Sequence, residues 1–438
     1  MRRCLPAVLL CAVLAGAPPA SGAYRAVPGA PAAGPARYDR VWIETFGSPR
    51  ATKVLVLVPG TGGGAGSVAP VAHDLVARVP SLQVWALDRR EEALEDTSGF
   101  AGNDLAKARD YYLGFKYRQV GLAQAPFAAD WGLKTGLEDL RRVVRLAADG
   151  GRRSVILGGH SRGASTAAAY AAWDFNGRPG YRDLAGLVLI DGGLLGAIAG
   201  NSPAPLPLAK ARSRLAKIRG GDLFNDALGA GIPSAGPIFL ELAALHAAAA
   251  PGAVSPLQSA AIVPAALKPP YTATNESFLG NIFDDDTSLP SFRSLRLHAG
   301  HAAASGDPRP WISGEQTPIQ RFARAFAATR PNATEWYFPN RLILDISAAN
   351  AMGRNPASSF LGLRLFHTRE IDTPLYAFQT DLTFGAVAAG ARRLVKASRI
   401  QTSKIVSDVT MSHLDPVLAV PSRNTFTKTV VPFLQRLP

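Results

Sequence analysis

Residues 154–173 have the sequence SVILGGHSRGASTAAAYAAW, and this stretch decides the fold. It starts with an apolar run that is typical of a buried strand and ends in an alanine-rich segment that is typical of a helix. Gly159 and Gly163 flank Ser161 in the tight turn between the two. Such a turn strains the backbone of the serine, and a Cβ at either glycine would collide with neighbouring chain. The pattern therefore predicts strand, sharp turn and helix, with the Ser161 hydroxyl exposed for chemistry.

The first 23 residues have the pattern of a secretory signal peptide. Arg2 and Arg3 precede an apolar core, and small residues follow it. The apolar run is too short to span a bilayer comfortably, and no other run reaches the roughly 20 apolar residues of a transmembrane helix. Both cysteines, Cys4 and Cys11, lie in this segment, so the rest of the chain offers no thiol for a disulfide or a zinc site. We expect a secreted or periplasmic protein without a transmembrane segment.

The sequence is basic, with 47 Lys and Arg against 33 Asp and Glu and a formal net charge of +14. The basic residues are scattered along the chain rather than clustered in a stripe. We therefore expect no nucleic-acid partner. A weak association with an anionic cell envelope is the one charge-based interaction that this composition favours.

The chain of 438 residues is longer than one compact domain usually needs, and its pattern changes along its length. Residues 24–37 are rich in Pro, Ala and Gly and predict a linker that does not order itself. Residues 38–193 alternate between strand and helix patterns and predict the first part of an α/β core. Residues 194–371 lose this alternation and predict a mainly helical lid, inserted after the strand that follows Ser161. Residues 372–438 resume the alternation and complete the core.

The predicted elements point to an α/β fold with a mostly parallel central sheet and helices on both faces. Besides the strand before Ser161, strands are predicted at residues 40–46, 53–58, 82–87, 184–190, 374–379 and 404–410. Helices of the core are predicted at residues 68–79, 137–148, 386–397 and 422–437, and helices of the insertion at residues 208–218, 238–249 and 319–328.

Together these features resemble the α/β-hydrolase superfamily, which includes esterases and lipases. The resemblance rests on the GHSRG turn around Ser161, on the PGTGGG loop at residues 59–64 and on the chain order Ser, Asp, His. It covers about residues 40–190 and 373–437 but not the helical insertion. It implies that Ser161 is a nucleophile, which needs a histidine base, a carboxylate that orients the base, and donors for an oxyanion.

The oxyanion donors are expected on either side of Ser161. The backbone N–H of Arg162 is the first, because it opens the predicted helix. The resemblance implies the backbone N–H of Thr61 as the second. Since the family often has His-Gly where this chain has Pro59-Gly60, it stays open which amide of this loop donates.

His413 is the candidate base, and two aspartates compete for the role of the acid. Of the seven histidines, only His413 lies in a loop after the last predicted strand. Asp381 follows the strand at residues 374–379 and is the favoured acid, since the 32 residues from Asp381 to His413 leave room for one helix and one strand. Asp191, at the end of the strand after Ser161, is the alternative. Asp415 is expected only to shape its turn.

Three further groups have two interpretations each. Trp336, Tyr337 and Phe338 either line an apolar substrate channel or pack the insertion onto the sheet, and the sequence does not distinguish these roles. The Arg162 side chain is expected to be solvated or salt-bridged rather than in contact with an acidic substrate. The histidine pair at 298 and 301 and the acidic run at 284–286 lack the ligand pattern of a metal site. We expect no metal and no organic cofactor.

The sequence thus favours a secreted serine hydrolase that cleaves a carboxylic ester of a small-molecule or lipid-like substrate. An amidase or peptidase of the same fold is the alternative within enzymes, because it would use the same triad. A non-catalytic secreted binding protein on this scaffold is the alternative from another class. The serine argues against dehalogenases and epoxide hydrolases, which the resemblance implies carry an aspartate at this position.

Overall fold

The computed structural model describes residues 24–102, 104–198, 203–229, 231–261, 263–327 and 331–438. The predicted signal peptide lies outside the described residues. Within these ranges, no helix combines the length and the apolar character needed to cross a membrane.

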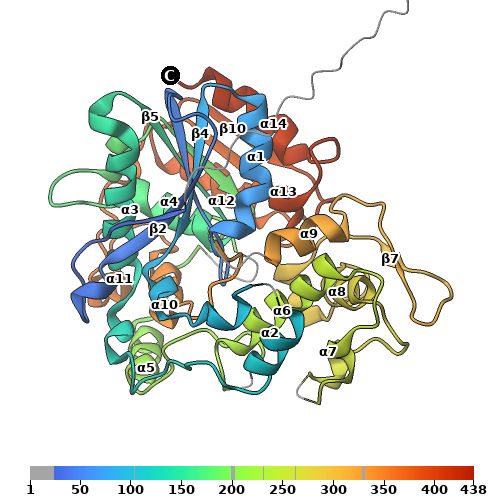
Figure 1. Cartoon of the computed structure of the whole chain (residues 1–438). Coiled ribbons are helices and arrows are strands. Elements are labelled where there is room, and N and C mark those ends of the chain that lie inside the picture. The colour runs from blue at the N-terminus through green and yellow to red at the C-terminus, as the bar shows by residue number, and fades with distance from the viewer. Residues whose placement is uncertain (1–23, 103, 199–202, 230, 262, 328–330) are drawn as a thin grey trace, which may run out of the picture.

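An eight-stranded sheet forms the centre of the molecule, in the order β1-β2-β4-β3-β5-β6-β9-β10 (Figure 1). The strands β1 and β2 run antiparallel to their neighbours, and the six strands from β4 to β10 are parallel. The strands span β1 (Arg25–Pro28), β2 (Arg40–Phe46), β3 (Lys53–Val58), β4 (Leu82–Asp88), β5 (Ser154–His160), β6 (Gly186–Ile190), β9 (Leu375–Gln379) and β10 (Ser403–Ser407). The predicted mostly parallel sheet is confirmed.

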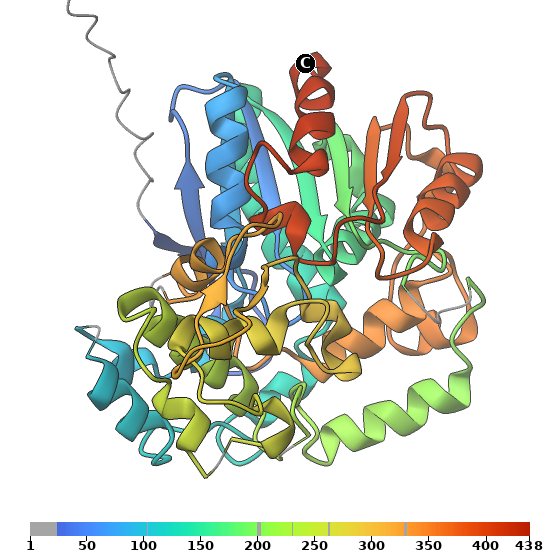
Figure 2. The same cartoon turned by 90° about the vertical axis from the view of Figure 1, so that its right-hand side faces the viewer.

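Helices cover both faces of this sheet, which explains why β3, β4 and β6 are buried along their whole length. On one face α1 (Ala69–Arg78) contacts α14 (Thr425–Arg436), as Figure 2 shows. On the other face α3 (Leu133–Ala148) contacts α4 (Arg162–Ala172), and α12 (Ala386–Ala397) packs on β9 and β10. All of α4 after Arg162 is buried, so its small alanine side chains allow the helix to lie close against the strands.

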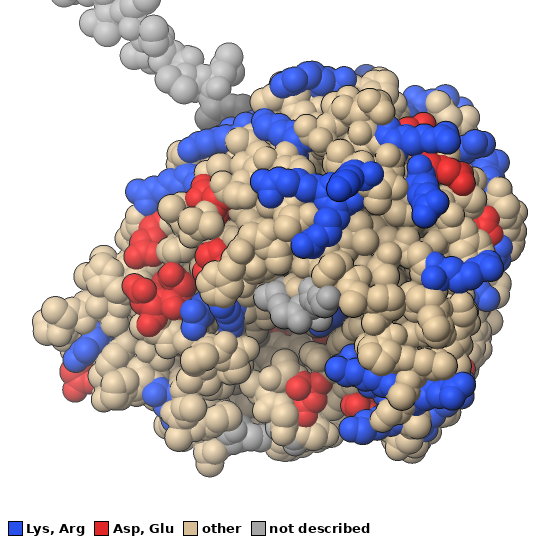
Figure 3. All heavy atoms as spheres, turned by 180° about the vertical axis from the view of Figure 1, so that it is seen from behind, with Lys and Arg blue, Asp and Glu red and all other residues tan. Residues whose placement is uncertain are grey.

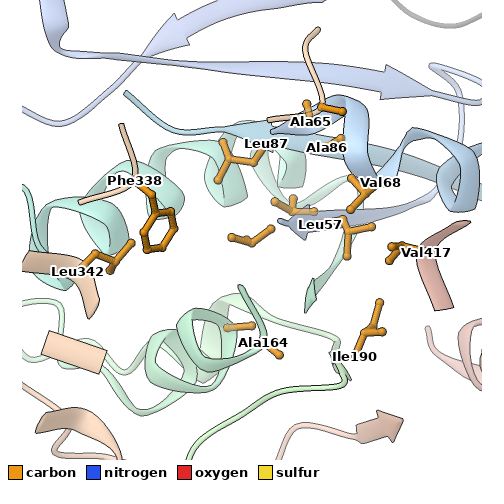
Figure 4. Close-up of a cluster of buried hydrophobic side chains, with 14 of the residues drawn as sticks. Leu57, Ala65, Val68, Ala86, Leu87, Ala164, Ile190, Phe338, Leu342 and Val417 are labelled. Carbon is orange, nitrogen blue, oxygen red and sulfur yellow. The ribbon is translucent and has the colours of Figure 1, made fainter. Parts of the chain in front are cut away.

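The core continues from the sheet into the insertion. Figure 4 shows Leu57 of β3, Ile190 of β6 and Ala164 of α4 in one apolar cluster with Phe338 and Leu342 of the insertion. Apolar burial of this kind stabilises by about 25 cal/mol per Å². The insertion is therefore packed onto the α/β core rather than attached at its edges.

The insertion between β6 and β9 is mainly helical, as predicted. The helices predicted at 208–218, 238–249 and 319–328 correspond to α5, α6 and α9. Its elements are α5 (Leu208–Arg219), α6 (Ala235–Ala249), α7 (Pro256–Ser259), α8 (Asn275–Phe283), α9 (Ile319–Phe326), α10 (Asn340–Ala349), α11 (Pro356–Phe360) and a two-stranded sheet of β7 (His301–Ala302) and β8 (Trp311–Ile312). The helix α2 (Leu105–Tyr112), which comes from the core sequence, contacts α6.

Residues 24–37 do not form the predicted linker. Residues Arg25–Pro28 are the edge strand β1, paired with β2. Beyond β1, the backbone N–H of Ala30 donates to Asp139 at 2.6 Å, and Arg90 donates to the Ala30 carbonyl at 2.8 Å. Trp131 donates to the Ala33 carbonyl at 2.9 Å. The segment is ordered by hydrogen bonds of its backbone with distant residues, which its low content of large apolar side chains does not reveal.

Candidate active site

Ser161 occupies the strained turn that the sequence predicts. Its φ of 55° and ψ of −122° lie outside the usual regions for a non-glycine residue, and it stands between β5 and α4. Its backbone N–H donates to the carbonyl of Ile190 at 2.8 Å, which ties the turn to the end of β6. A Cβ on Gly159 would overlap the backbone of Gly163, and a Cβ on Gly163 would overlap the carbonyl oxygen of Val58. Both positions therefore require glycine.

His413 and Asp191 form a buried hydrogen-bonded pair. The Nδ1 atom of His413 lies 2.5 Å from Oδ2 of Asp191, and both side chains are almost fully buried. The carboxylate also accepts hydrogen bonds from the backbone N–H of Thr380 at 2.9 Å and from its hydroxyl at 2.5 Å. Burial raises the pKa of Asp191, but the hydrogen bonds and the charge of His413 outweigh this effect and hold the pKa below its usual value. Asp191 is therefore ionised and holds Nε2 of the imidazole free.

The expectation that Asp381 contacts the histidine is corrected by this geometry. Asp381 donates its backbone N–H to the carbonyl of Met411 at 3.1 Å, and among the described residues no hydrogen bond joins its carboxylate to His413. Asp191 and Asp381 follow two neighbouring strands, because β6 pairs with β9. Both aspartates thus follow strands that end at the same end of the sheet, but the hydrogen bonds of His413 and Thr380 are formed with Asp191.

The glycine loop after β3 lies directly against Ser161. A Cβ on Gly60 would stand 2.9 Å from the Cβ of Ser161. The insertion and the core hold this loop in place: Arg89 donates to the carbonyl of Pro59 at 2.6 Å, and the backbone N–H of Glu335 donates to the carbonyl of Gly62 at 2.9 Å. Thr61 and Arg162 line the same cavity as Ser161, which places both residues near its side chain.

Comparison with known proteins supports the fold. No protein-family model matches the sequence, and no curated protein matches it either. Among solved structures, that of a presumed lipase from Sulfolobus solfataricus matches 94% of this chain and 99% of its own, with 16% identity and a TM-score of 0.51. An esterase from Thermogutta terrifontis covers 95% and 99% of the two chains with 12% identity and a TM-score of 0.40. Epoxide hydrolase A from Mycobacterium thermoresistibile covers 95% and 99% with 14% identity and a TM-score of 0.43.

The first of these matches has a TM-score above 0.5 over nearly the whole of both chains, and the mostly parallel eight-stranded sheet with a sharp strand-turn-helix at Ser161 is typical of α/β-hydrolases. This chain has the α/β-hydrolase fold. The predicted fold class is thereby confirmed. At such low identities the matches bear on the fold alone and not on the reaction.

A cavity of about 400 Å³ opens in this α/β-hydrolase fold above the ends of the parallel strands. Ser161, His413 and Thr61 stand on its polar side. Its other wall is apolar and comes largely from α6, α8, α9 and the residues after α8. The wall includes Phe239, Leu240, Ile282, Phe283, Phe292, Leu295, Phe322 and Phe326. The insertion therefore shapes most of the space next to Ser161.

The three consecutive aromatic residues divide between the two roles that the sequence left open. Phe338 lines the cavity, whereas Trp336 and Tyr337 do not. The indole of Trp336 packs edge-on against Tyr112, with ring centroids 5.7 Å apart, and the hydroxyl of Tyr337 accepts a hydrogen bond from Val120 at 3.1 Å. These two fix the insertion to the core, and only Phe338 faces the candidate site.

His160 supports the loop that carries His413, a role that sequence analysis missed. Its Nε2 donates to the carbonyl oxygen of His413 at 2.9 Å, and the two rings lie 4.4 Å apart. Burial and the nearby His413 lower the pKa of His160 to about 3, so its ring stays neutral. His160 thus holds the backbone of His413 in place while its own ring stays uncharged. Its place next to Ser161 in the sequence was the only available signal.

Asp415 does more than shape its own turn. It accepts a hydrogen bond from the backbone N–H of Ser412 at 2.7 Å, as expected for a turn. It also accepts from Thr317 at 2.7 Å and from His298 at 2.6 Å, both in the insertion. Asp415 therefore ties the loop of His413 to the insertion.

His298 and Asp284, two of the residues that could resemble metal ligands, form ion pairs and hydrogen bonds with other residues of the chain. His298 forms ion pairs with Asp415 and with Asp285, the latter at 3.2 Å. Side-chain oxygens of Asp284, Asp285 and Glu315 lie within 4.8 Å of one another. Asp284 is buried and accepts a hydrogen bond from the backbone N–H of Ala299 at 3.0 Å. Its carboxylate stabilises the 299–300 loop, and an acidic cluster alone does not define a metal site.

Proposed function

We propose that this chain is a serine hydrolase that cleaves a carboxylic ester through an acyl-enzyme on Ser161. One observation carries the proposal: the hydrogen-bonded pair of His413 and Asp191 lines the same cavity as the strained serine. Asp191 takes the role of the acid in place of Asp381. This constellation is the serine, histidine and aspartate arrangement that activates a hydroxyl nucleophile.

In the first half of the reaction Ser161 Oγ attacks the ester carbonyl while Nε2 of His413 takes the hydroxyl proton. Asp191 stabilises the imidazolium that forms and does not itself take the proton. The backbone N–H groups of Arg162 and Thr61 receive the oxyanion, and donors of this kind are worth roughly 3 kcal/mol each in the transition state. His413 then protonates the leaving alcohol, and the acyl group stays on the serine.

In the second half His413 removes a proton from water, which attacks the acyl group and releases the carboxylic acid. The chain's own groups suffice for both halves, so no metal or organic cofactor enters the scheme. The apolar wall favours a lipid-like or other apolar substrate, and the insertion would act as a lid over the cavity. Export through residues 1–23 and weak association with an anionic cell envelope stay predictions from the sequence.

The test combines a covalent probe with one substitution. A fluorophosphonate should label Ser161 in the purified wild-type protein, and Ser161→Ala should abolish both the labelling and the turnover of p-nitrophenyl esters. Ser165→Ala, in α4 directly after the turn of Ser161, is the matched control and should keep the labelling at Ser161. Labelling of another residue, or unchanged turnover by Ser161→Ala, would contradict the proposal.

A substrate panel separates the ester hydrolase from its alternatives. We expect hydrolysis of p-nitrophenyl esters and little hydrolysis of the matching p-nitroanilides. Cleavage of the anilides at comparable kcat/KM would instead indicate an amidase. A protein that is not labelled and hydrolyses neither series would be a non-catalytic member of this fold.

A further inference from the structure

The Arg162 side chain differs from the other charged groups of the cavity because it has no partner. It stands directly after Ser161 and lines the cavity. Among the described residues, no carboxylate forms an ion pair with its guanidinium, and no hydrogen bond from it is formed. The carboxylates of the lining are both paired: Asp191 with His413 at 2.5 Å, and Glu335 with Arg89 at 2.6 Å. Of the two expectations for the Arg162 side chain, solvated or salt-bridged, the salt bridge is absent from the described part of the chain, and the side chain is partly exposed.

Arg162 is also the only lysine or arginine among the described residues that line this cavity. A half-buried guanidinium loses hydration, and it recovers the lost energy only through hydrogen bonds with an anion or other acceptor. Burial lowers the pKa of Arg162, and the charge of Arg214 lowers it further. The two carboxylates of the lining are paired with other residues, so a bound anion would offset the positive charge of Arg162.

Arg214 belongs to a helix that is basic throughout. The helix α5 has the sequence LAKARSRLAKIR and contains no acidic residue. Its basic side chains are all exposed: Lys210, Arg212, Arg214, Lys217 and Arg219. Figure 3 shows Lys and Arg side chains on one side of a hollow on one face of the molecule, with Asp and Glu side chains at its lower edge. Exposed basic side chains attract anions over short distances.

We infer that the substrate carries a carboxylate in addition to the ester, and that the Arg162 guanidinium binds this carboxylate next to Ser161. The apolar wall takes the hydrocarbon part of the same molecule. The substrate class is therefore an apolar ester with one acidic group, such as the half-ester of a dicarboxylic acid. This inference rests on the proposed ester hydrolysis and adds the charge of the substrate to it.

Two esters with acyl chains of equal length test the inference. They are mono-p-nitrophenyl adipate, which ends in a carboxylate, and p-nitrophenyl hexanoate, which ends in a methyl group. The measured quantity is the ratio of kcat/KM for the adipate to kcat/KM for the hexanoate. Arg162→Gln retains the backbone N–H that is placed in the oxyanion hole, so the ratio isolates the side chain. We expect this ratio to fall about ten- to hundredfold, the range for a hydrogen bond to a charged group.

Two further variants control for charge and folding. Arg392→Gln removes the same charge from an exposed site of α12, and it should leave the ratio within about twofold of the wild-type value. Arg214→Gln should lower the ratio by a smaller factor than Arg162→Gln, because Arg214 is exposed on α5, does not line the cavity and acts only through its charge. Thermal melts of all variants report whether they fold.

The outcomes separate this inference from the proposed function. If wild-type protein hydrolyses the hexanoate and the ratio is the same in Arg162→Gln, the carboxylate site is overturned and the ester hydrolase stands. An equal fall of the ratio in Arg392→Gln would also overturn it, because the effect would then come from net charge. If neither ester is hydrolysed by wild-type protein, both the function and this inference fail.

Discussion

Asp191 is the side chain on which the proposed chemistry depends most sharply after the serine. Its carboxylate holds His413 in one orientation and one tautomer, because it accepts a hydrogen bond from the protonated Nδ1 atom at 2.5 Å. An amide at this position retains the shape but can donate as well as accept, so the imidazole can turn or change its tautomer. Asp191→Asn should therefore lower kcat for ester hydrolysis by roughly 10⁴-fold, with a small change in KM.

The matched control is Asp381→Asn, which removes a carboxyl group at the same end of the sheet. It should lower kcat by less than about tenfold, because its carboxylate forms no hydrogen bond with His413 among the described residues. Steady-state kinetics of the two variants with one p-nitrophenyl ester suffice. Equal losses in both, or a larger loss in Asp381→Asn, would restore Asp381 as the acid.

At this scale the sequence singled out Ser161 and His413, whereas the structure pairs His413 with Asp191 rather than with the favoured Asp381. Ser161 lies in the recognisable GHSRG motif, and His413 is the only histidine in the loop after the last predicted strand. The two aspartates differ only in which of two neighbouring strands they follow, and Ile190 pairs with Phe378 in the sheet. The choice depends on the hydrogen bonds of Thr380, a contact between distant residues that no local pattern announces.

At the scale of elements, α6, α8 and α9 form the apolar wall that faces the serine. Phe326 stands in the last turn of α9 and lines the cavity, whereas Phe278 of α8 is fully buried and does not. Phe326→Ala should extend the cavity, so the ratio of kcat/KM for p-nitrophenyl dodecanoate to that for the butyrate should rise severalfold. A methylene group is worth about 0.8 kcal/mol when it is buried, so a few additional methylenes account for such a change.

Phe278→Ala provides the comparison, because it removes the same atoms from α8 away from the cavity. It should destabilise the fold by about 3 kcal/mol or more, as large-to-small core substitutions do, and leave the chain-length preference as in wild type. Melting temperatures and the two kcat/KM values are measured for each variant. If both variants shift the preference equally, the cavity wall does not select the acyl chain.

The helices of this wall were predictable, whereas the order of the N-terminal segment was not. Apolar periodicity and Pro- and Gly-rich loops marked α5, α6 and α9 within a few residues. Residues 24–37 lack large apolar side chains, and their order comes from pairing of β1 with β2 and from buried Asp139 and Arg90. Those partners lie far away in the sequence, so composition alone predicted a linker.

At the scale of the whole molecule, buried carboxyl groups join the insertion to the core. Asn332 donates to Glu95 at 2.6 Å, and the backbone N–H of Trp336 donates to the same carboxyl group at 2.7 Å. Thr334 and Trp336 donate to Glu241 of α6. Burial raises the pKa of Glu95 well above its usual range, and the negative charges of Glu92 and Glu241 raise it further. A chain with a net charge of +14 therefore holds acidic groups in its interior that resist ionisation.

These groups make the stability of the fold depend on pH on both sides of a maximum. Burial raises the pKa of Glu241 to about 8 from a value of 4.5, so the stability it contributes is lost as the pH rises between these values. Burial lowers the pKa of His298, but hydrogen bonds and charges of Asp285 and Asp415 outweigh burial and raise the pKa to about 10. The stability that the charged His298 contributes is therefore lost as the pH rises above 6.5. His160 has the opposite effect. Its pKa is about 3 in the folded protein against 6.5 for a free imidazole, so the folded state loses stability as the pH falls below 6.5.

The melting temperature should therefore be highest between about pH 4.5 and pH 6.5 and fall by several degrees toward pH 9. Glu241→Gln tests the alkaline side, because glutamine still accepts from Thr334 and Trp336 but cannot ionise. Its melting temperature should fall less between pH 6 and pH 9 than that of wild type. Glu138→Gln, at a partly exposed site of α3, should give a curve parallel to wild type. If Glu241→Gln is also parallel to wild type, Glu241 is ionised without cost in the folded protein, and the alkaline loss must come from other groups.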